Sequence, residues 1–172
     1  EGSHVLKKAV VLGMDGVYGA DGRLDESATE FMISNDHVLG TVAAHPQHLL
    51  AGVSINPSRR DALEEVARCA ERGAFLVKVL PNTQQFNPAE ERFRSFYRAL
   101  ADRKLPFLSH VGYEFSLIGK DQSVGDPARL RLALEEGVTV IAAHGASQGL
   151  FFHEPHWKTL TEFVTRYPHF YW

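Results

Sequence analysis

The chain has 172 residues, of which 44% are hydrophobic and 23% are charged, a balance typical of one globular domain. Its net charge of −3 and its scattered basic residues give no electrostatic basis for binding nucleic acid. No apolar run approaches the ~18 residues of a membrane span, and the single cysteine, Cys69, cannot form an internal disulfide. We therefore expect one cytoplasmic domain over residues 1–172.

Six short apolar runs along the chain predict six β-strands. The runs are continuous rather than alternating, which suits strands buried on both faces of a parallel sheet. From the second run onward they start about 25–32 residues apart, the size of a βα repeat. The predicted strands cover residues 9–12, 49–55, 74–80, 106–110, 138–144 and 169–172.

Amphipathic segments between the runs predict helices, most of them with clear capping signals. Asn or Asp followed by Pro marks the start of two helices, and Gly or Pro follows the end of three. The connection from Asp15 to His48 is unusually long, and we interpret its first part as a flap over the strand ends. The predicted helices lie near 36–45, over 59–72, from Asn87, over 126–137 and over 155–166.

Parallel strands joined by helices predict an α/β fold, either a doubly wound open sheet or a closed (β/α)₈ barrel. Six strands fit the open sheet by count, since a complete barrel needs eight strands and about 250 residues. The open sheet also predicts a glycine-rich phosphate loop after the first strand, and the segment Gly13-Met14-Asp15-Gly16 lacks that pattern. The polar residues at the strand ends favour the barrel.

Four predicted strands end in a polar residue after an otherwise apolar run. A buried ionisable group is costly unless it is paired or bound to a metal. Four such groups at equivalent positions of successive units indicate convergence on one site, which in barrels lies at the carboxyl-end face. The four residues are Asp15, Lys78, His110 and His144.

The two histidines are the most informative of these residues. Imidazole binds zinc and also acts as a base near neutral pH. Small residues follow each of them, Val111-Gly112 after His110 and Gly145-Ala146-Ser147 after His144, and they leave room for a ligand. The alternative is a core histidine that bonds to a backbone carbonyl. For a single histidine we would prefer that alternative, but the matched pair favours a functional site.

The other polar residues allow several interpretations. Lys78 can form an ion pair with Asp15 or Glu114, bind an anionic substrate, or be carbamylated and bridge two metals, and we favour the first two over the third. Asp15 is explained equally well as a turn residue before Gly16. Glu114 lies in the loop after His110, where it either touches substrate or is exposed to solvent. Asp15, Glu114 and Ser147 are our candidate substrate-binding residues.

Four segments resemble the amidohydrolase-related (amidohydrolase 2) family, in the branch that includes aminocarboxymuconate semialdehyde decarboxylase. The resemblance implies a distorted (β/α)₈ barrel with one or two divalent metals, with zinc expected. It makes His110 the metal ligand of strand five and His144 the histidine of strand six, which binds a second metal or contacts substrate and the activated water. Lys78 falls on strand four, where some members carry a carbamylated lysine. The segments are VKVLPN at 77–82, LPFLSHVG at 105–112, GDP at 125–127 and GVTVIAAH at 137–144.

Two family features are absent from the sequence, the His-x-His pair of strand one and the aspartate that ends strand eight. The resemblance therefore implies an incomplete barrel that holds about strands two to seven and is truncated at both ends. Such a piece lacks essential metal ligands, and we expect it to be inactive by itself.

For the complete protein the leading hypothesis is a metal-dependent hydrolase that uses metal-activated water on an amide, lactone or related carbonyl substrate. In this hypothesis His110 and His144 hold the metal, and His144 and Lys78 act in catalysis. Metal-dependent decarboxylation of a small carboxylated substrate is the enzymatic alternative. A degenerate barrel that binds a ligand or partner without turnover is the third. We expect a small-molecule substrate, and a homo-oligomer is compatible with the sequence.

Overall fold

The computed structural model describes residues 7–117, 119–144 and 156–172. In these ranges six strands form one sheet in the order β1-β2-β3-β4-β5-β6, and every neighbouring pair is parallel. The predicted parallel sheet is confirmed, with slightly shorter strands. Their bounds are β1 Ala9–Leu12, β2 Leu49–Val53, β3 Ala74–Val79, β4 Phe107–His110, β5 Val140–Ala143 and β6 Phe170–Tyr171.

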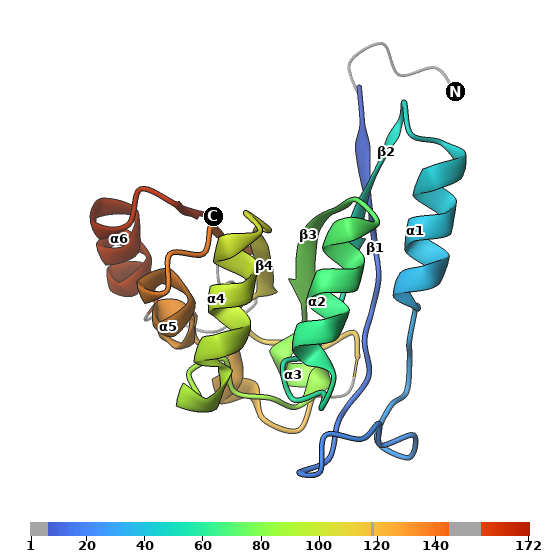
Figure 1. Ribbon diagram of the computed structural model, residues 1–172. Helices are drawn as coiled ribbons and strands as arrows, with labels where there is room; N and C mark the ends of the chain where they lie inside the picture. The colour runs from blue at the N-terminus through green and yellow to red at the C-terminus, as the bar shows by residue number, and fades with distance from the viewer. Residues whose placement is uncertain (1–6, 118, 145–155) are drawn as a thin grey trace.

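Helices connect the strands and pack along the outer face of the sheet (Figure 1). A strand order that follows the chain without reversal belongs to a barrel wall, because a doubly wound sheet reverses direction at its switch point. The barrel interpretation is therefore confirmed and the open sheet is wrong. The α-helices are α1 Asn35–Ala44, α2 Ala62–Glu71, α3 Pro81–Gln84, α4 Arg94–Asp102, α5 Arg131–Glu135 and α6 Trp157–Arg166, and the short 3₁₀ helices are η1 Glu91–Phe93, η2 Gln122–Gly125 and η3 Pro127–Leu130.

Two predicted helices begin later than their capping residues suggest. Asn87 accepts a hydrogen bond from the Ala89 N–H and closes a turn, so α4 starts only after η1. Asp126 caps η3 rather than an α-helix, because its side chain accepts from the Ala128 N–H. Both side chains form the expected capping hydrogen bond, but each caps a turn that is tighter than a turn of α-helix. The short elements α3 and η2 have no signal in the sequence pattern.

The register of the sheet separates two rows of side chains. Parallel partners share a face, and successive residues of one strand point to opposite faces. One row, Val77, Phe107, Val140 and Phe170, is buried against the helices, each member at most 5% exposed. The adjacent row faces the inside of the barrel and is made of Lys78, Leu108, Ile141 and Tyr171.

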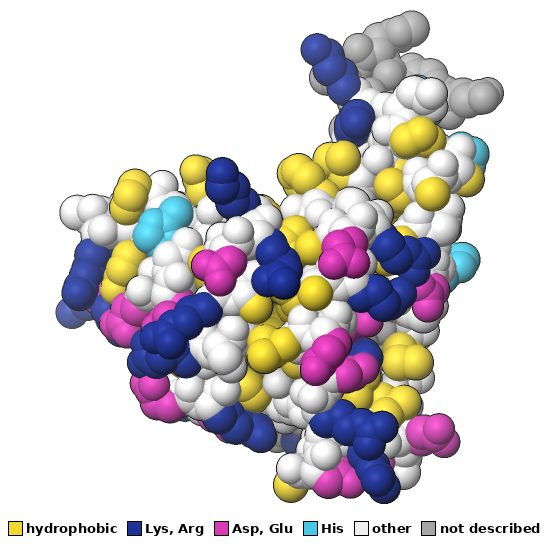
Figure 2. Space-filling view, viewed as in Figure 1, with side chains coloured by type: hydrophobic (Ala, Val, Ile, Leu, Met, Phe, Trp, Pro, Cys, Tyr) yellow, Lys and Arg dark blue, Asp and Glu magenta, His cyan; other side chains and the backbone are white. Residues whose placement is uncertain are grey.

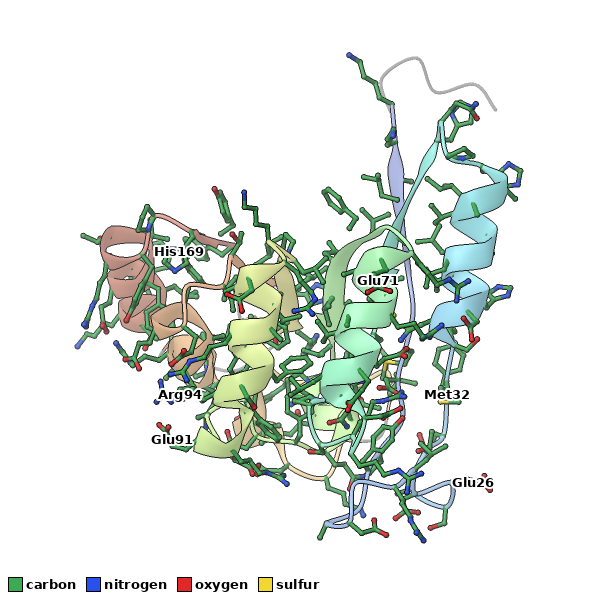
Figure 3. All side chains as sticks on the ribbon, viewed as in Figure 1. Glu26, Met32, Glu71, Glu91, Arg94 and His169 are labelled. Carbon is green, nitrogen blue, oxygen red and sulfur yellow. The ribbon has the colours of Figure 1, made fainter. Side chains whose placement is uncertain are left out.

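The outer helical surface carries interspersed charges of both signs (Figure 2). Glu91 and Arg94 form one of its ion pairs, 2.7 Å long, at the start of α4 (Figure 3). Such exposed pairs add little stability, so the apolar row beneath the helices holds the wall together. Among the described residues no helix combines the length and apolar composition needed to cross a lipid bilayer.

The long connection after β1 doubles back on itself at the carboxyl-end face. Isolated antiparallel bridges pair Met14 with Ile33 and Tyr18 with Leu24. The predicted flap is therefore a folded hairpin-like loop beside the ends of β1 and β2.

Replacing Phe107 with Ala should lower the free energy of unfolding by about 3–5 kcal/mol, because its fully buried ring packs edge-on against Phe96 and Tyr97. Phe75 of β3 is the control, because it shares a face of the sheet with Val77 and Phe107 but is 47% exposed. Phe75→Ala should lower the free energy of unfolding by less than about 1 kcal/mol. Urea unfolding of both variants measures the difference. Equal losses would mean that the helix-facing row does not dominate the core.

Candidate metal centre

The two predicted histidines come together where β4 and β5 end. His110 is the last residue of β4, and His144 follows β5 directly. Their ring centroids lie 5.0 Å apart, and both rings line a cavity of about 300 Å³ together with Glu114. His144 has a φ of 68°, in the left-handed region, so its backbone is no longer in the extended conformation of β5. Neighbouring parallel strands thus present two imidazoles to one cavity.

The His110 imidazole has one nitrogen beside a carboxylate and one without a partner. Its Nδ1 lies 3.7 Å from Oε2 of Glu114, within ion-pair range but longer than a hydrogen bond. Its Nε2 is buried and has no hydrogen-bond partner among the described residues. Burial, together with the nearby Lys78 charge, lowers the pKa of His110, which favours the neutral ring. A neutral imidazole with an unpaired buried nitrogen fits a divalent metal.

Lys78 is buried on the inner face of β3, and its Nζ donates to the Val79 carbonyl at 3.0 Å. Burial lowers its pKa to about 8, and the Glu114 carboxylate partly opposes that shift. The predicted ion pair between Lys78 and Asp15 is wrong, because Asp15 pairs with Arg59 instead. Glu114 acts on Lys78 only through its electrostatic field in the described structure. Lys78 therefore keeps its charge near the histidines without a direct carboxylate partner.

Glu114 is buried, at 9% exposure, so the solvent-exposed alternative for this residue is wrong. Its Oε1 accepts hydrogen bonds from the backbone N–H groups of Ser116 at 2.5 Å and Leu117 at 3.2 Å. Burial raises its pKa, but these two bonds and the nearby His110 outweigh burial, and the net shift is downward. Glu114 is thus an ionised carboxylate held against His110.

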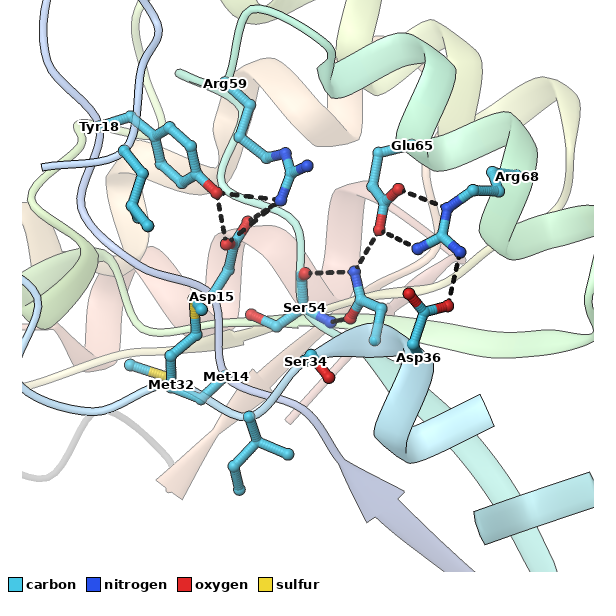
Figure 4. Close-up of a pocket in the computed structure, with 13 residues that line it drawn as sticks. Met14, Asp15, Tyr18, Met32, Ser34, Asp36, Ser54, Arg59, Glu65 and Arg68 are labelled. Atoms are coloured by element: carbon cyan, nitrogen blue, oxygen red, sulfur yellow. Dashed lines mark hydrogen bonds and ion pairs between the residues drawn. The ribbon is translucent and has the colours of Figure 1, made fainter. Parts of the chain in front are cut away.

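Asp15 lies in a different pocket, of about 200 Å³, between the loop after β1 and the start of α2 (Figure 4). Its carboxylate accepts from the Tyr18 hydroxyl at 2.8 Å, the Asn56 N–H at 2.8 Å and the Arg59 guanidinium at 3.4 Å. These bonds occupy both oxygens. Binding of substrate by Asp15 stays a prediction, and the contacts seen here stabilise the loop. The other candidate, Ser147, lies outside the described residues.

The described residues supply only part of a metal site. Within 7–117, 119–144 and 156–172, no three His, Cys, Asp or Glu side chains converge in a way that would hold an ion. His110 and His144 would therefore be two ligands of a larger set. Sequence analysis missed the contacts of Arg59 and Gln122, and no motif marks either residue.

Comparison with known proteins supports this fold. A family model described as Amidohydrolase matches residues 7–171. The chain is similar to an uncharacterized TIM-barrel protein from Bordetella bronchiseptica, with a TM-score of 0.68 and 18% identity over 96% of this chain and 53% of that chain. It is similar to 5-carboxyvanillate decarboxylase LigW from Sphingomonas paucimobilis, with a TM-score of 0.53 and 16% identity over 65% of this chain and 40% of that one. No curated protein matches the chain.

A further likeness is to 2,6-dihydroxybenzoate decarboxylase from Rhizobium, with a TM-score of 0.51 and 17% identity over 75% of this chain and 54% of that one. The chain spans about half the length of these proteins, at most 54%. At such low identity these likenesses establish the fold alone. They confirm that the six-stranded sheet is a large part of a TIM barrel.

Replacing Lys78 with Met should raise the free energy of unfolding at pH 7 by about 3 kcal/mol, because the fold no longer buries an ammonium group. The folded pKa of about 8 lies below the usual 10.5, so between these values the unfolded chain binds a proton that the folded chain does not. The wild type is therefore penalised fully below pH 8, and the penalty fades as the pH rises toward 10.5. Urea unfolding across this range measures the effect. If the increase in the free energy of unfolding does not change with pH, it comes from better packing of the methionine side chain and not from removal of the buried charge.

Proposed function

The chain belongs to the amidohydrolase family, as the resemblance in its sequence indicated, and we propose that the complete protein is a divalent-metal-dependent enzyme that decarboxylates a small carboxylated substrate. The observation that carries this proposal is the buried, unpartnered Nε2 of His110, on a ring that lines the same cavity as His144. An orphaned buried nitrogen costs free energy unless a ligand uses it. A cytoplasmic location and a homo-oligomer stay predictions.

His110 and His144 would hold the cation, with the Glu114 carboxylate beside the second nitrogen of His110. A divalent cation, when bound, supplies a Lewis acid that polarises a carboxylate or lowers the pKa of water. A carboxylate next to Nδ1 favours a proton on that nitrogen and leaves the lone pair on Nε2, an arrangement common to metal-binding histidines. Both nitrogens of His110 thus have a use in the proposed site.

Lys78 is the proposed partner of the substrate carboxylate. With a pKa of about 8 it is mostly protonated at pH 7, and it lies on the same inner face as His110. Because it is buried and has no direct carboxylate partner in the described residues, an anionic substrate would be stabilised there more than in water. Carbamylation of Lys78 would remove this cation and is the less favoured alternative.

The cavity also offers an aromatic surface. Tyr113 and Phe115 lie edge to face with ring centroids 5.9 Å apart, and Phe115 is 72% exposed. An exposed ring beside buried charges suits a planar apolar body that carries an acidic group. The related decarboxylases from Sphingomonas paucimobilis and Rhizobium, named for 5-carboxyvanillate and 2,6-dihydroxybenzoate, act on substrates of this kind. These features favour decarboxylation over hydrolysis, which was the leading hypothesis from the sequence alone.

In decarboxylation the carbon–carbon bond to the carboxylate breaks, carbon dioxide leaves and the ring carbon takes a proton. The His144 imidazole is exposed at the cavity. Where it contacts the substrate instead of the metal, it is our candidate for holding that proton. Hydrolysis is the second candidate, because the matching family model is described as Amidohydrolase and the same centre can activate water. The third hypothesis, a degenerate barrel that binds a ligand or partner without turnover, requires no metal.

Purified full-length protein should contain a divalent metal in stoichiometric amount, and His110→Ala should weaken its affinity at least about tenfold, because the buried ligand nitrogen is gone. His37→Ala, at an exposed position of α1, is the matched control and should keep the metal. Elemental analysis and chelator competition measure both. Folded, metal-free wild type would support the non-catalytic reading, and full metal in His110→Ala would refute the proposed site.

Carbon dioxide release from a panel of aromatic carboxylates, 2,6-dihydroxybenzoate and 5-carboxyvanillate included, should separate the two reactions. The metal-loaded protein should release carbon dioxide from at least one member, and His110→Ala should lose that activity by a factor of at least about 100, as expected when a metal ligand is removed. Turnover of lactones or cyclic amides without carbon dioxide release would instead establish hydrolysis.

A further inference from the structure

We propose that Gln122 and Asn82 are positioning residues of the metal centre, which hold Glu114 so that its carboxylate stands beside Nδ1 of His110. This inference rests on the proposed function, since it concerns the same two histidines. It names two residues that touch neither the metal nor the substrate.

The side-chain amide of Gln122 binds both backbone groups of Glu114. Its Oε1 accepts from the Glu114 N–H at 2.9 Å, and its Nε2 donates to the Glu114 carbonyl at 2.9 Å. The Gln122 side chain thus satisfies the N–H and the C=O of Glu114 in the way that the backbone of a neighbouring strand would. Two bonds from one side chain fix both the position and the rotation of the Glu114 peptide groups.

Asn82 holds the Gln122 amide in turn. Its Nδ2 donates to Gln122 Oε1 at 3.0 Å, so this oxygen has two donors. Because the Glu114 N–H already identifies that atom as the acceptor, the group of Asn82 that faces it must be the NH₂. Asn82 is fully buried in α3, four residues after Lys78. The chain of bonds therefore ties the end of β3 to the loop after β4.

The base of the loop is closed independently of Gln122. The Gly112 N–H donates to the Gly125 carbonyl at 2.8 Å, and a Cβ on Gly125 would come within 2.1 Å of the Gly112 oxygen. Only glycine fits at position 125. Since the hydrogen bond between Gly112 and Gly125 keeps the two ends of the loop together, loss of the Gln122 bonds should move Glu114 without unfolding the loop.

The placement of Glu114 matters because the Glu114–His110 contact is long. At 3.7 Å the carboxylate acts on Nδ1 through charge rather than through a tight hydrogen bond, and its effect depends on where the loop backbone holds it. Its Oε1 is already used by the N–H groups of Ser116 and Leu117, so only Oε2 faces the ring. A backbone group of Tyr113, the preceding residue, also forms a hydrogen bond with the His110 ring. A shift of the loop backbone at Glu114 would therefore change both influences on the proton preference of Nδ1 and on the availability of Nε2.

The test is a double-mutant cycle on the full-length protein, read as Zn²⁺ affinity by competition with a chromophoric chelator. Gln122→Met keeps the length of the side chain and removes all three hydrogen bonds, and it should weaken Zn²⁺ binding about tenfold. Glu114→Gln should weaken it to a similar extent. The double variant should bind no more weakly than Glu114→Gln alone, because Gln122 acts through Glu114. Gln47→Met, at an exposed turn, is the matched control and should leave the affinity unchanged.

Unchanged Zn²⁺ affinity in folded Gln122→Met, or losses that multiply in the double variant, would overturn the inference. If Gln122→Met does not fold, Gln122→Glu keeps the oxygen that accepts from the Glu114 N–H and replaces the donor to the Glu114 carbonyl by a charged acceptor that repels it, so Zn²⁺ affinity should again fall. Wild-type affinity in that variant would equally overturn it.

A second readout needs no metal. Nitrogen-15 NMR of the His110 ring in the apo protein should show the proton on Nδ1 in wild type and a mixed population in Gln122→Met. If wild type shows the Nδ1 proton but binds no Zn²⁺, the proposed function fails while the positioning role of Gln122 stands. The same ring spectrum in wild type and Gln122→Met would remove the positioning role even if the metal binds.

Discussion

The register of the parallel strands is the constraint on which the rest of the molecule depends. Because partners across parallel strands share a face, the row from Val77 through Phe107 must face the helices once Lys78 faces the barrel interior. His110 follows Leu108 by two residues and therefore joins Lys78 on the inner face. A shift of one residue would bury charged groups under the helices and expose the apolar row. The hydrophobic core and the candidate centre are thus two consequences of one register.

That register places several ionisable groups where water is scarce. Burial disfavours the charged forms of both Lys78 and His110, and the Glu114 carboxylate opposes both shifts. Burial raises the pKa of Glu114, but hydrogen bonds from two backbone N–H groups and the nearby His110 outweigh it, so Glu114 stays ionised. The centre therefore combines a neutral imidazole with a cation and a carboxylate. These forms are compatible with the proposed roles of His110 as a metal ligand, Lys78 as a carboxylate-binding group and Glu114 as the group that orients His110.

The features that could be predicted from the sequence are those set by local pattern. Continuous apolar runs located the strands, and a polar residue at the end of such a run located His110 and His144, because parallel strands end on one face. The helix after Asn87 was predicted too early, since a capping side chain closes a tight turn as readily as a helix. Asn82 and Gln122 could not be found this way. Their contacts join residues 40 positions apart, and amide side chains have no preferred spacing for such a link.

Two polar pockets at the carboxyl-end face differ in what their side chains leave unused. Around Asp15, each carboxylate oxygen and the Arg59 guanidinium already have protein partners, so this network stiffens the loop after β1 and needs no ligand. Around His110, by contrast, one buried ring nitrogen keeps its lone pair free among the described residues. Since folding rarely leaves such an atom unpaired without a use, this difference supports the pocket around His110, rather than the one around Asp15, as the proposed functional centre. The same comparison explains why Asp15 and His110, equivalent in the sequence pattern, have different roles in the fold.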